Sequence, residues 1–235
     1  MRTDTIKVWD PFIRVFHWSL VGLFTLSYVT GETEESVHVW SGYAILVLIA
    51  LRIIWGFVGS RHARFTDFVR SPAAVSRYLK KEFSGNAPRS LGHNPAGGWM
   101  VLLLLLSILA TGGSGLIVLG LEGDGPMASH IAADGWIVTV GNTLGESETH
   151  ENQAYKEEED DHEYEGDRAS LHKETSTQAN QPLAAAEDTW EEIHEFLANF
   201  TVFLVVLHIA GVLISSIAHR ENLVRAMFSG MKRAP

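Results

Sequence analysis

The chain has 235 residues, no cysteine and a formal net charge of −10 at pH 7. The absence of cysteine excludes disulfides, iron–sulfur clusters and covalently attached c-type haem, so any redox cofactor must be held by histidine or methionine. The mean hydropathy is close to zero, but this average combines long apolar runs with strongly polar stretches between them.

Four apolar runs stand out, and they cover residues 12–30, 37–59, 98–121 and 196–218. Each has about the 17–25 residues that a membrane-spanning helix needs. The sequence therefore predicts an all-α membrane protein built as a four-transmembrane-helix bundle. The first run is interrupted by His17 and is not followed by a cleavage site, so it is predicted to be a retained helix and not a signal peptide.

The basic residues predict the orientation of these helices. Lys and Arg number 3 in residues 1–14, 7 in residues 59–93 and 4 in residues 219–235. The positive-inside rule predicts that these segments, and with them both termini, lie on the cytoplasmic side of the membrane. Residues 121–195 hold 20 acidic and 3 basic residues and are predicted to lie in the periplasm.

This topology divides the chain into three parts. Residues 1–121 are predicted to form the first three helices, with a cytoplasmic loop at 60–95. Residues 122–187 are predicted to form an acidic periplasmic loop that is partly disordered. Residues 188–235 complete the chain as the fourth helix and a cytoplasmic tail.

The first two helices each carry one histidine within the apolar run. His17 lies about a turn and a half from the cytoplasmic end of the first helix, whereas His38 opens the second helix at the periplasmic edge. Arg52 shares the face of His38 at the depth of an inner site, where it and Arg14 could pair with a haem propionate. The alternative for Arg52 is that its side chain extends to the cytoplasmic interface.

The loop after the second helix predicts a short amphipathic helix at residues 72–83 that lies on the inner leaflet. The third helix follows and is predicted to end in the glycine-rich run at 111–115. At its cytoplasmic start, His93 and Asn94 could bind the carbonyl groups of a quinone. Asn94 could instead simply cap the helix, with Pro95 at the first helical position.

The periplasmic loop contains the most acidic stretch of the chain, residues 146–167. It is too charged to bury a core and is predicted to be disordered when free, serving as a solvated tether or as a docking surface for a basic electron carrier. His150, His162 and His172 could bind a metal ion with neighbouring carboxylates, but their spacing fits no fixed ligand pattern.

The fourth helix contains two histidines, His194 and His208, fourteen residues apart. At about 100° and 1.5 Å per residue, both imidazoles lie on nearly the same face, separated by about 21 Å along the helix. Ionisable groups at such depths in a membrane usually mark a function. The two histidines therefore predict two stacked haems, each with one ligand on this helix, unless they only join helices through hydrogen bonds.

Topology and depth together predict the ligand pairs. His194 begins outside and meets His38, while His208 lies deeper and meets His17. Both irons would then have two imidazole ligands and no open axial position, so they would shuttle electrons without binding oxygen or substrate. Gly42 and Gly211 are small near these histidines, which would leave room for a macrocycle, although small residues are also common in helix–helix contacts.

Several long motifs resemble one known family. They are KVWDPFIRVFHW, VHVWSGY, RIIWGFVGSRHARF, LGHNPAGG and the closing HIAGV and HRENLVRAMFSGMKR. Together they are similar to the bacterial cytochrome b561 family, which includes the b-type cytochrome subunit of nickel–iron hydrogenases. The similarity covers nearly the whole chain except about residues 142–187, so the acidic insert departs from it.

This resemblance implies two non-covalent b haems and electron exchange between the quinone pool and a periplasmic partner. Matched motif by motif, the haem ligands of the family fall on His17, His38, His194 and His208. Related respiratory b subunits place a quinone near an Asn-and-Gly motif that the NPAGG run resembles without matching its spacing. The resemblance also implies haem iron as the bound metal.

The sequence therefore predicts a di-haem transmembrane electron carrier. Its predicted partners are membrane lipid, a quinone and a periplasmic redox protein such as a c-type cytochrome or a hydrogenase, with no nucleic acid. One alternative is a stand-alone superoxide-to-quinone oxidoreductase, which the acidic outer surface disfavours because it would repel an anion. A second alternative is a histidine-based zinc or proton transport protein without haem.

Overall fold

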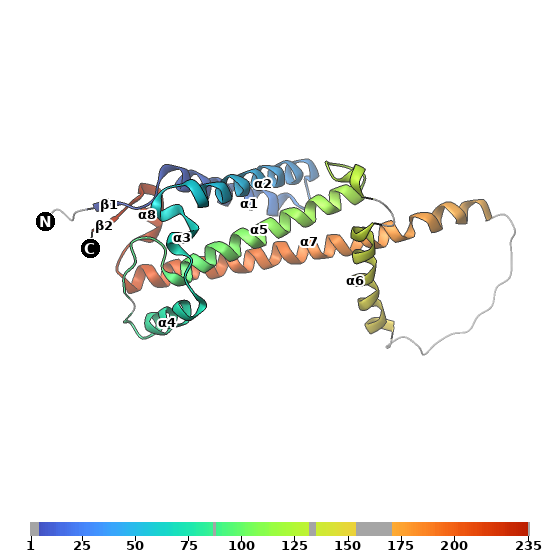
Figure 1. Cartoon of the computed structure of the whole chain (residues 1–235). Helices are drawn as coiled ribbons and strands as arrows, with labels where there is room; N and C mark the ends of the chain where they lie inside the picture. Colours follow the sequence, from blue (N-terminus) through green and yellow to red (C-terminus); the bar gives the residue numbers. More distant parts are fainter. Residues whose placement is uncertain (1–4, 87, 132–134, 154–170, 235) are drawn as a thin grey trace. The chain divides into compact units, whose positions relative to one another are not determined.

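The computed structural model describes residues 5–86, 88–131, 135–153 and 171–234, and these residues are almost entirely helical (Figure 1). Within them, four helical segments are long and apolar enough to cross a membrane: Pro11–Thr30 (α1), Glu35–Val58 (α2), Pro95–Leu121 (α5) and the Leu183–Ala218 part of α7. The predicted class, an all-α membrane protein with four spanning helices, is confirmed.

The shorter elements connect these helices. They are β1 (Thr5–Lys7), η1 (Arg61–Ala63), α3 (Phe65–Phe68), α4 (Pro72–Phe83), η2 (Ala128–His130), α6 (Trp136–Gln153), α8 (Leu223–Ser229) and β2 (Met231–Arg233), and α7 as a whole is Leu171–Ala218. The amphipathic helix predicted at 72–83 is confirmed as α4. By contacts, the chain forms one unit of residues 1–112 and 198–235 and a second unit of residues 113–197.

Three helices of the chain begin with the same signal, a capping side chain followed by proline. Asp10 accepts a hydrogen bond from the Ile13 backbone N–H at the start of α1, and Ser71 accepts one from Ala74 at the start of α4. Asn94 lies directly before Pro95, the first residue of α5. Proline fits the first helical turn because its missing N–H has no partner there in any case.

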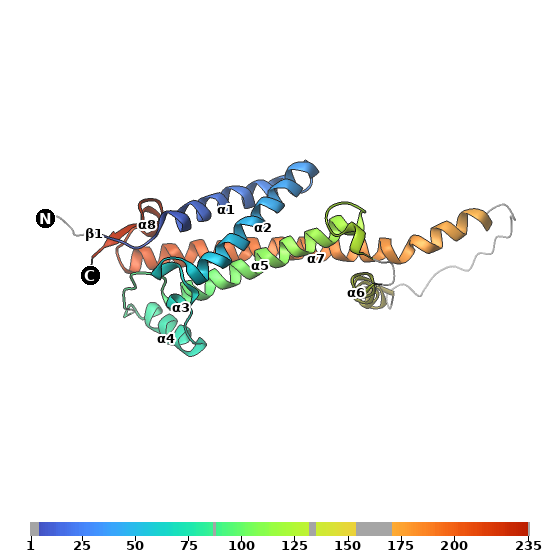
Figure 2. The ribbon, with the colours of Figure 1, turned by 45° about the horizontal axis from the view of Figure 1, so that its top comes forward.

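In the first unit, α1 and α2 form an antiparallel pair that lies side by side in Figures 1 and 2. Large apolar side chains from α1, α2 and α5 build the buried core of this unit: Phe16, Ile45, Ile49, Leu105 and Ile108. The C-terminal part of α7 joins the unit through polar contacts, because the Tyr28 hydroxyl donates to Asn199 Oδ1 at 2.8 Å.

The two chain ends meet in a short antiparallel sheet, with Ile6 opposite Lys232. Glu221 ties this sheet end to the loop before α5, because its carboxylate lies 2.8 Å from Arg89 and 3.9 Å from Lys232. Burial alone would raise the pKa of Glu221, but the Arg89 hydrogen bond and the Lys232 charge lower it overall. Both termini therefore lie at the same end of the first unit, as the predicted topology requires.

Asp10 connects three elements at this end. Its carboxylate caps α1 through Ile13 N–H at 2.9 Å, accepts from Trp55 Nε1 at 3.2 Å and accepts from the Ser60 hydroxyl. Burial would raise the pKa of Asp10, but these hydrogen bonds and the positive charge of Arg52 lower it overall. The ionised carboxylate is thus the form that holds α1 against the end of α2.

We expect Asp10→Ala to lower the free energy of unfolding by about 1–2 kcal/mol, because a helix cap is lost together with two side-chain partners. Since the pKa of Asp10 is lowered in the folded state, its contribution is present above the ordinary carboxyl pKa of about 3.9 and is lost as the pH falls through the folded value. Thermal unfolding in detergent at several pH values measures both effects. Asp10→Asn, which keeps the cap, should cost less, and equal losses for both variants would contradict the capping role.

The second unit has its own small core, made by Leu121 at the end of α5, Ile137 and Val138 on α6, and Ala186 on α7. The Trp190 indole N–H donates to the Ile137 carbonyl at 3.1 Å and fastens α6 to α7. Gly141 allows this close contact, since a Cβ there would lie 2.9 Å from the Cα of Ala186.

Two predicted boundaries differ from the structure. Helix α5 does not end at 111–115 but continues to Leu121, because glycines are tolerated inside apolar helices where a neighbour approaches closely. At Gly112, for example, an added Cβ would lie only 2.6 Å from Leu46 Cδ2, so the glycine allows Leu46 on α2 to pack against the α5 backbone. Helix α7 begins at Leu171, well before the apolar run, and the helix-forming run Ala184, Ala185, Ala186 and Glu187 lies between its first turns and that apolar run. Of the stretch predicted to be disordered, the part up to Gln153 is helical in α6, and 154–170 lie outside the described residues.

Candidate functional site

Two of the predicted ligands lie near each other in the first unit. His17 on α1 and His208 on α7 have ring centres 6.5 Å apart, with the ring planes inclined by 53°. Two imidazoles that bind one metal ion through bonds of about 2.0–2.1 Å have ring centres roughly 6.2 Å apart. The observed separation therefore fits a single iron between the two rings.

One glycine lies near His208 and another near His38. A Cβ added at Gly211, an exposed position three residues after His208, or at Gly42, four residues after His38, would have no atom of the described chain within 4 Å. Within the described residues, Nδ1 of His17 is buried and has no hydrogen-bond partner. Buried polar atoms are normally satisfied, so an unsatisfied imidazole nitrogen is consistent with a ligand site.

His38 is oriented by the end of the preceding helix. Its Nδ1 lies 2.9 Å from the backbone carbonyl of Ser27 and 3.3 Å from the Ser27 hydroxyl. A carbonyl only accepts, so the Nδ1–H form of the ring is favoured and Nε2 carries the lone pair that binds a metal. Such a hydrogen bond to the second nitrogen is typical of histidines that ligate metals.

His194 has a comparable partner in the second unit. Its Nδ1 lies 3.0 Å from the Ser114 hydroxyl on α5, and a Cβ at Gly115 would lie 3.0 Å from His194 Cε1. The glycine thus allows α5 to approach the imidazole closely. His38 and His194 belong to different units, so their pairing at one iron stays a prediction.

Of the two arginines proposed to bind haem propionates, Arg52 is buried and Arg14 is half-buried. Arg52 is only 3% exposed; it donates to the Ala63 carbonyl at 3.1 Å, and its guanidinium lies 5.1 Å from the centre of the Phe65 ring. Arg52 is therefore held inside the protein and does not extend to the surface. Arg14 donates to the Ser229 carbonyl at 3.4 Å. Among the described residues, Arg52 Nη1 and Arg14 Nε are buried without a hydrogen-bond partner, as a bound anionic group would require.

His93 lies between two aromatic rings, 4.7 Å from the ring centre of Trp9 and 4.7 Å from that of Phe68. Burial lowers the pKa of His93 to about 3, and the nearby charges of Arg52 and Lys232 and the ring of His208 act in the same direction. The imidazole is thus neutral at physiological pH and close to the His17–His208 pair.

Asn94 acts as the cap of α5. Its Oδ1 accepts a hydrogen bond from the Gly97 backbone N–H at 2.6 Å. The simple capping role that the sequence left open is therefore present. The amide nitrogen of the same side chain remains a donor that a ligand could use.

Ser27 and Ser114 are the residues that sequence reasoning missed. Each is buried within an apolar helix and contacts a predicted ligand, His38 or His194. The signal that could have found them is a serine inside an apolar run at the depth of a histidine on another helix. This signal is weak, because a serine in a helix can also donate its hydroxyl hydrogen bond to a backbone carbonyl of the same helix.

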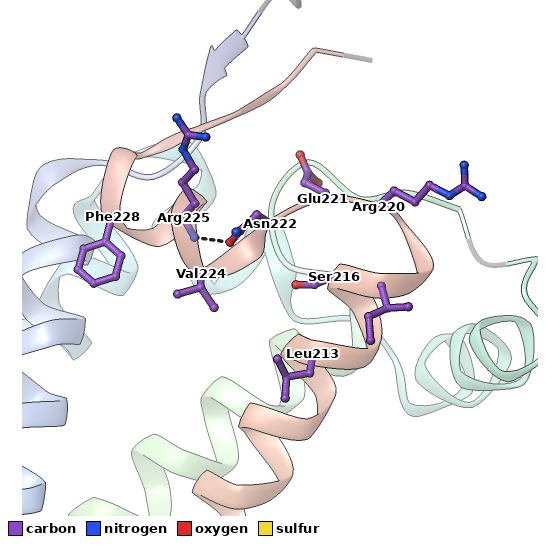
Figure 3. Close-up of a pocket in the computed structure, with 9 residues that line it drawn as sticks. Leu213, Ser216, Arg220, Glu221, Asn222, Val224, Arg225 and Phe228 are labelled. Atoms are coloured by element: carbon purple, nitrogen blue, oxygen red, sulfur yellow. Dashed lines mark hydrogen bonds between the residues drawn. The ribbon is translucent and has the colours of Figure 1, made fainter.

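A hollow of about 620 Å³ lies where α7 ends and α8 begins (Figure 3). Leu213, Ile217, Val224 and Phe228 give it apolar walls, while the Arg220 and Arg225 side chains extend away from them. Phe228 also stacks on Trp18, with ring centres 4.1 Å apart. An open apolar hollow at the end of a spanning helix is the kind of surface that lipid covers, and no ligand is assigned to it.

The histidines considered for a second metal, His150, His162 and His172, lie outside the residues whose side chains the structure describes. Among the described residues of the second unit, the carboxylates of Glu122, Glu187 and Glu191 converge, with oxygens within 4.8 Å of one another. These exposed and half-buried acidic groups add to the negative charge of this part of the chain.

The chain is similar to known proteins. The family model described as prokaryotic cytochrome b561 matches residues 8–230. A similar protein is the probable Ni/Fe-hydrogenase B-type cytochrome subunit of Rhizobium leguminosarum bv. viciae, 26% identical over 170 residues, which span 60% of this chain and 70% of the relative. No solved structure matches the chain.

Proposed function

Because this chain belongs to the prokaryotic cytochrome b561 family, a family of b-type membrane cytochromes, we propose that it carries electrons across the inner membrane between the quinone pool and a periplasmic redox partner. Two b haems, when bound, supply the one-electron chemistry. The chain supplies the ligands, the orientation and the electrostatic environment.

The observation that carries this proposal is the meeting of His17 and His208 from two different spanning helices at a ring separation of 6.5 Å. Two imidazoles fill both axial positions of one iron, so this pair would hold an inner haem as an electron carrier. His38 and His194 would hold an outer haem, with Ser27 and Ser114 orienting their rings.

The buried arginines suit the negative groups of a haem. Arg52 and Arg14 each have a buried nitrogen that meets no acceptor in the described chain. A guanidinium forms charge-assisted hydrogen bonds to carboxylates with favourable geometry. We assign both to haem propionates at the inner site.

The quinone would bind beside the inner haem, at His93 and Asn94. The neutral imidazole of His93 and the amide of Asn94 offer hydrogen bonds to the two polar ends of a quinone head group, and Trp9 and Phe68 provide aromatic walls. By the distribution of Lys and Arg, this end would face the cytoplasm, together with both termini.

The periplasmic partner would bind the acidic part of the chain. Residues 121–195 carry 20 acidic and 3 basic residues, and the three converging carboxylates of Glu122, Glu187 and Glu191 belong to the same segment. Such a surface attracts a basic protein and speeds its association. The relative named as a hydrogenase subunit makes a hydrogenase one candidate, and a basic c-type cytochrome is the other.

Electron transfer to quinone can be tested directly with the purified protein in proteoliposomes. The chemically reduced protein should be reoxidised when a ubiquinone or menaquinone analogue is added, as followed by the haem absorption bands. A protein without haem bands would instead support the transport alternative. A haem protein that no quinone oxidises would contradict the quinone part of the proposal.

We expect the rate of electron exchange with a basic c-type cytochrome to fall steeply as salt rises, because the attraction is screened within about 8–10 Å at 0.10–0.15 M. The 8 acidic residues between 157 and 167 can be changed to Ser and Gln without altering chain length. This variant should keep its haem spectrum but exchange electrons more slowly and with little salt dependence. An unchanged, salt-insensitive rate would show that the insert does not dock the partner.

A further inference from the structure

A second group of buried polar side chains lies where α4 meets the end of α7. Tyr78 and Glu82 come from α4, and His219 follows α7 directly. Tyr78 is 6% exposed, and the side chains of Glu82 and His219 are 8% and 15% exposed. None of the three belongs to the haem or quinone residues described above.

These side chains approach one another without completing hydrogen bonds. His219 Nε2 lies 3.5 Å from a carboxylate oxygen of Glu82. Among the described residues, the Tyr78 hydroxyl, both Glu82 oxygens and His219 Nε2 are buried and have no hydrogen-bond partner. Leaving one such atom unsatisfied costs about 1–3 kcal/mol, so native proteins satisfy them with ordered water or a ligand. Four of them in one place indicate a hydrated polar site and not a packed core.

The group extends toward the proposed quinone pocket. Burial raises the pKa of Tyr78 to about 12; Glu82 acts in the same direction, while the adjacent Ser215 and Asn94 side chains act against it. The Tyr78 hydroxyl is therefore close to Asn94, the neighbour of His93 in the chain. His219 is the more exposed partner of Glu82, and Tyr78 is the member next to Asn94, so the group leads from the protein surface toward the pocket.

Neither His93 nor Asn94 supplies the protons that reduction of a quinone consumes. His93 is neutral at physiological pH and can offer a hydrogen bond, but it holds no extra proton to give away. Asn94 does not titrate, and its carbonyl oxygen is used by the α5 cap. A carboxyl group and an imidazole within a short distance of the pocket would supply what these two residues cannot.

We propose that His219, Glu82 and Tyr78 form the path along which protons pass between cytoplasmic water and a quinone at His93 and Asn94. The inference rests on the proposed function. Reducing a quinone to a quinol takes two electrons, which the cytochrome carries, and two protons, one to form each O–H bond. Glu82 gives up a carboxyl proton through the Tyr78 hydroxyl and is protonated again from water through His219. Quinol oxidation reverses each step.

The test compares proton-coupled and proton-free oxidation of the reduced, haem-loaded protein. Glu82→Gln keeps the size and polarity of the side chain but cannot carry a proton. It should slow oxidation by an added quinone by roughly 100-fold and leave oxidation by ferricyanide, which takes up no proton, unchanged. Glu32→Gln makes the same change at an exposed carboxylate in the turn between α1 and α2 and should leave both rates at the parental value.

A second readout does not depend on turnover. Oxidation and reduction of the parental protein should produce the infrared C=O band of a carboxylic acid that gains or loses its proton, and Glu82→Gln should lack that band. Glu82→Asp, which keeps a titrating carboxyl, should restore part of the quinone rate. Parental quinone rates in Glu82→Gln, with the infrared band retained, would overturn the proposal.

Other results separate the remaining explanations. If quinone fails to oxidise even the parental protein, the proposed function is wrong and the fault does not lie with the proton path. If Glu82→Gln loses haem, or if its oxidation by ferricyanide is also slow, the substitution disturbs the structure. In that case Tyr78→Phe tests the proton path. That change removes one hydroxyl from an otherwise unchanged ring and should still slow only the quinone reaction; a parental quinone rate in Tyr78→Phe overturns the path.

Discussion

His17→Ala and His208→Ala should each remove the inner haem and leave the outer haem in place. The reason is that one iron needs both imidazoles, whose ring centres are 6.5 Å apart, and a single histidine holds a non-covalent haem poorly. Haem content should fall from about two to about one per chain in both variants. Redox titration of the remaining haem should give the same spectrum and potential for the two variants.

The opposite pair tests the outer site. His38→Ala and His194→Ala should remove the other spectral component, so that the four variants fall into two groups of two. His130→Ala is the matched control, since His130 is exposed and lies outside both proposed pairs. Loss of the same component from His17→Ala and His38→Ala would contradict the pairing.

His93→Ala should leave both haem spectra normal and slow the oxidation of reduced protein by quinone. A hydrogen bond worth about 1–3 kcal/mol is lost together with the ring that Trp9 and Phe68 enclose, so the rate should fall roughly ten- to hundredfold. Stopped-flow absorbance at the haem bands measures this rate directly.

Asn94 needs a separate design, because its side chain caps α5. Asn94→Ser retains a capping oxygen but removes the amide N–H groups, whereas Asn94→Ala removes both functions. A quinone defect in Asn94→Ser with unchanged thermal stability would support binding by the amide. If neither the His93 nor the Asn94 variants alter the quinone rate, the pocket lies elsewhere, and the side of the outer haem becomes the next candidate.

Much of the fold follows from the apolar runs in the sequence. Length and hydropathy alone predict the four spanning helices, because a chain in lipid must satisfy its backbone hydrogen bonds within a helix. The sequence also predicts the helix starts at Pro11, Pro72 and Pro95, since each proline follows a residue with a capping side chain. The pairing of β1 with β2 cannot be predicted from the sequence, because it joins residues at opposite ends of the chain through backbone atoms.

Helix ends inside uniform stretches are harder to predict. Glycines at 111–115 suggest a break, but in α5 they let Leu46 and His194 approach the backbone closely. The polar start of α7 carries no apolar periodicity and is rich in Thr, Ser, Asn and Gln, which are not strong helix formers, so the sequence does not predict a helix there.

The candidate site also has parts that the sequence predicts and parts that it does not. Histidine spacing on a continuous helix could be computed from the sequence, because the geometry of an α-helix is fixed. The contacts of His38 with Ser27 and the enclosure of His93 by Trp9 and Phe68 depend on how separate segments pack. The Tyr78, Glu82 and His219 cluster is also invisible in the sequence, since α4 reads as an ordinary amphipathic helix at a membrane surface.

The haem content of the purified parental protein tests the central claim most directly. Haem extracted from a known amount of chain should amount to about two b haems, and a redox titration should resolve them as two components without any ligand that binds an open iron position. A content near one haem per chain, or a reduced iron that binds carbon monoxide, would contradict two bis-histidine sites.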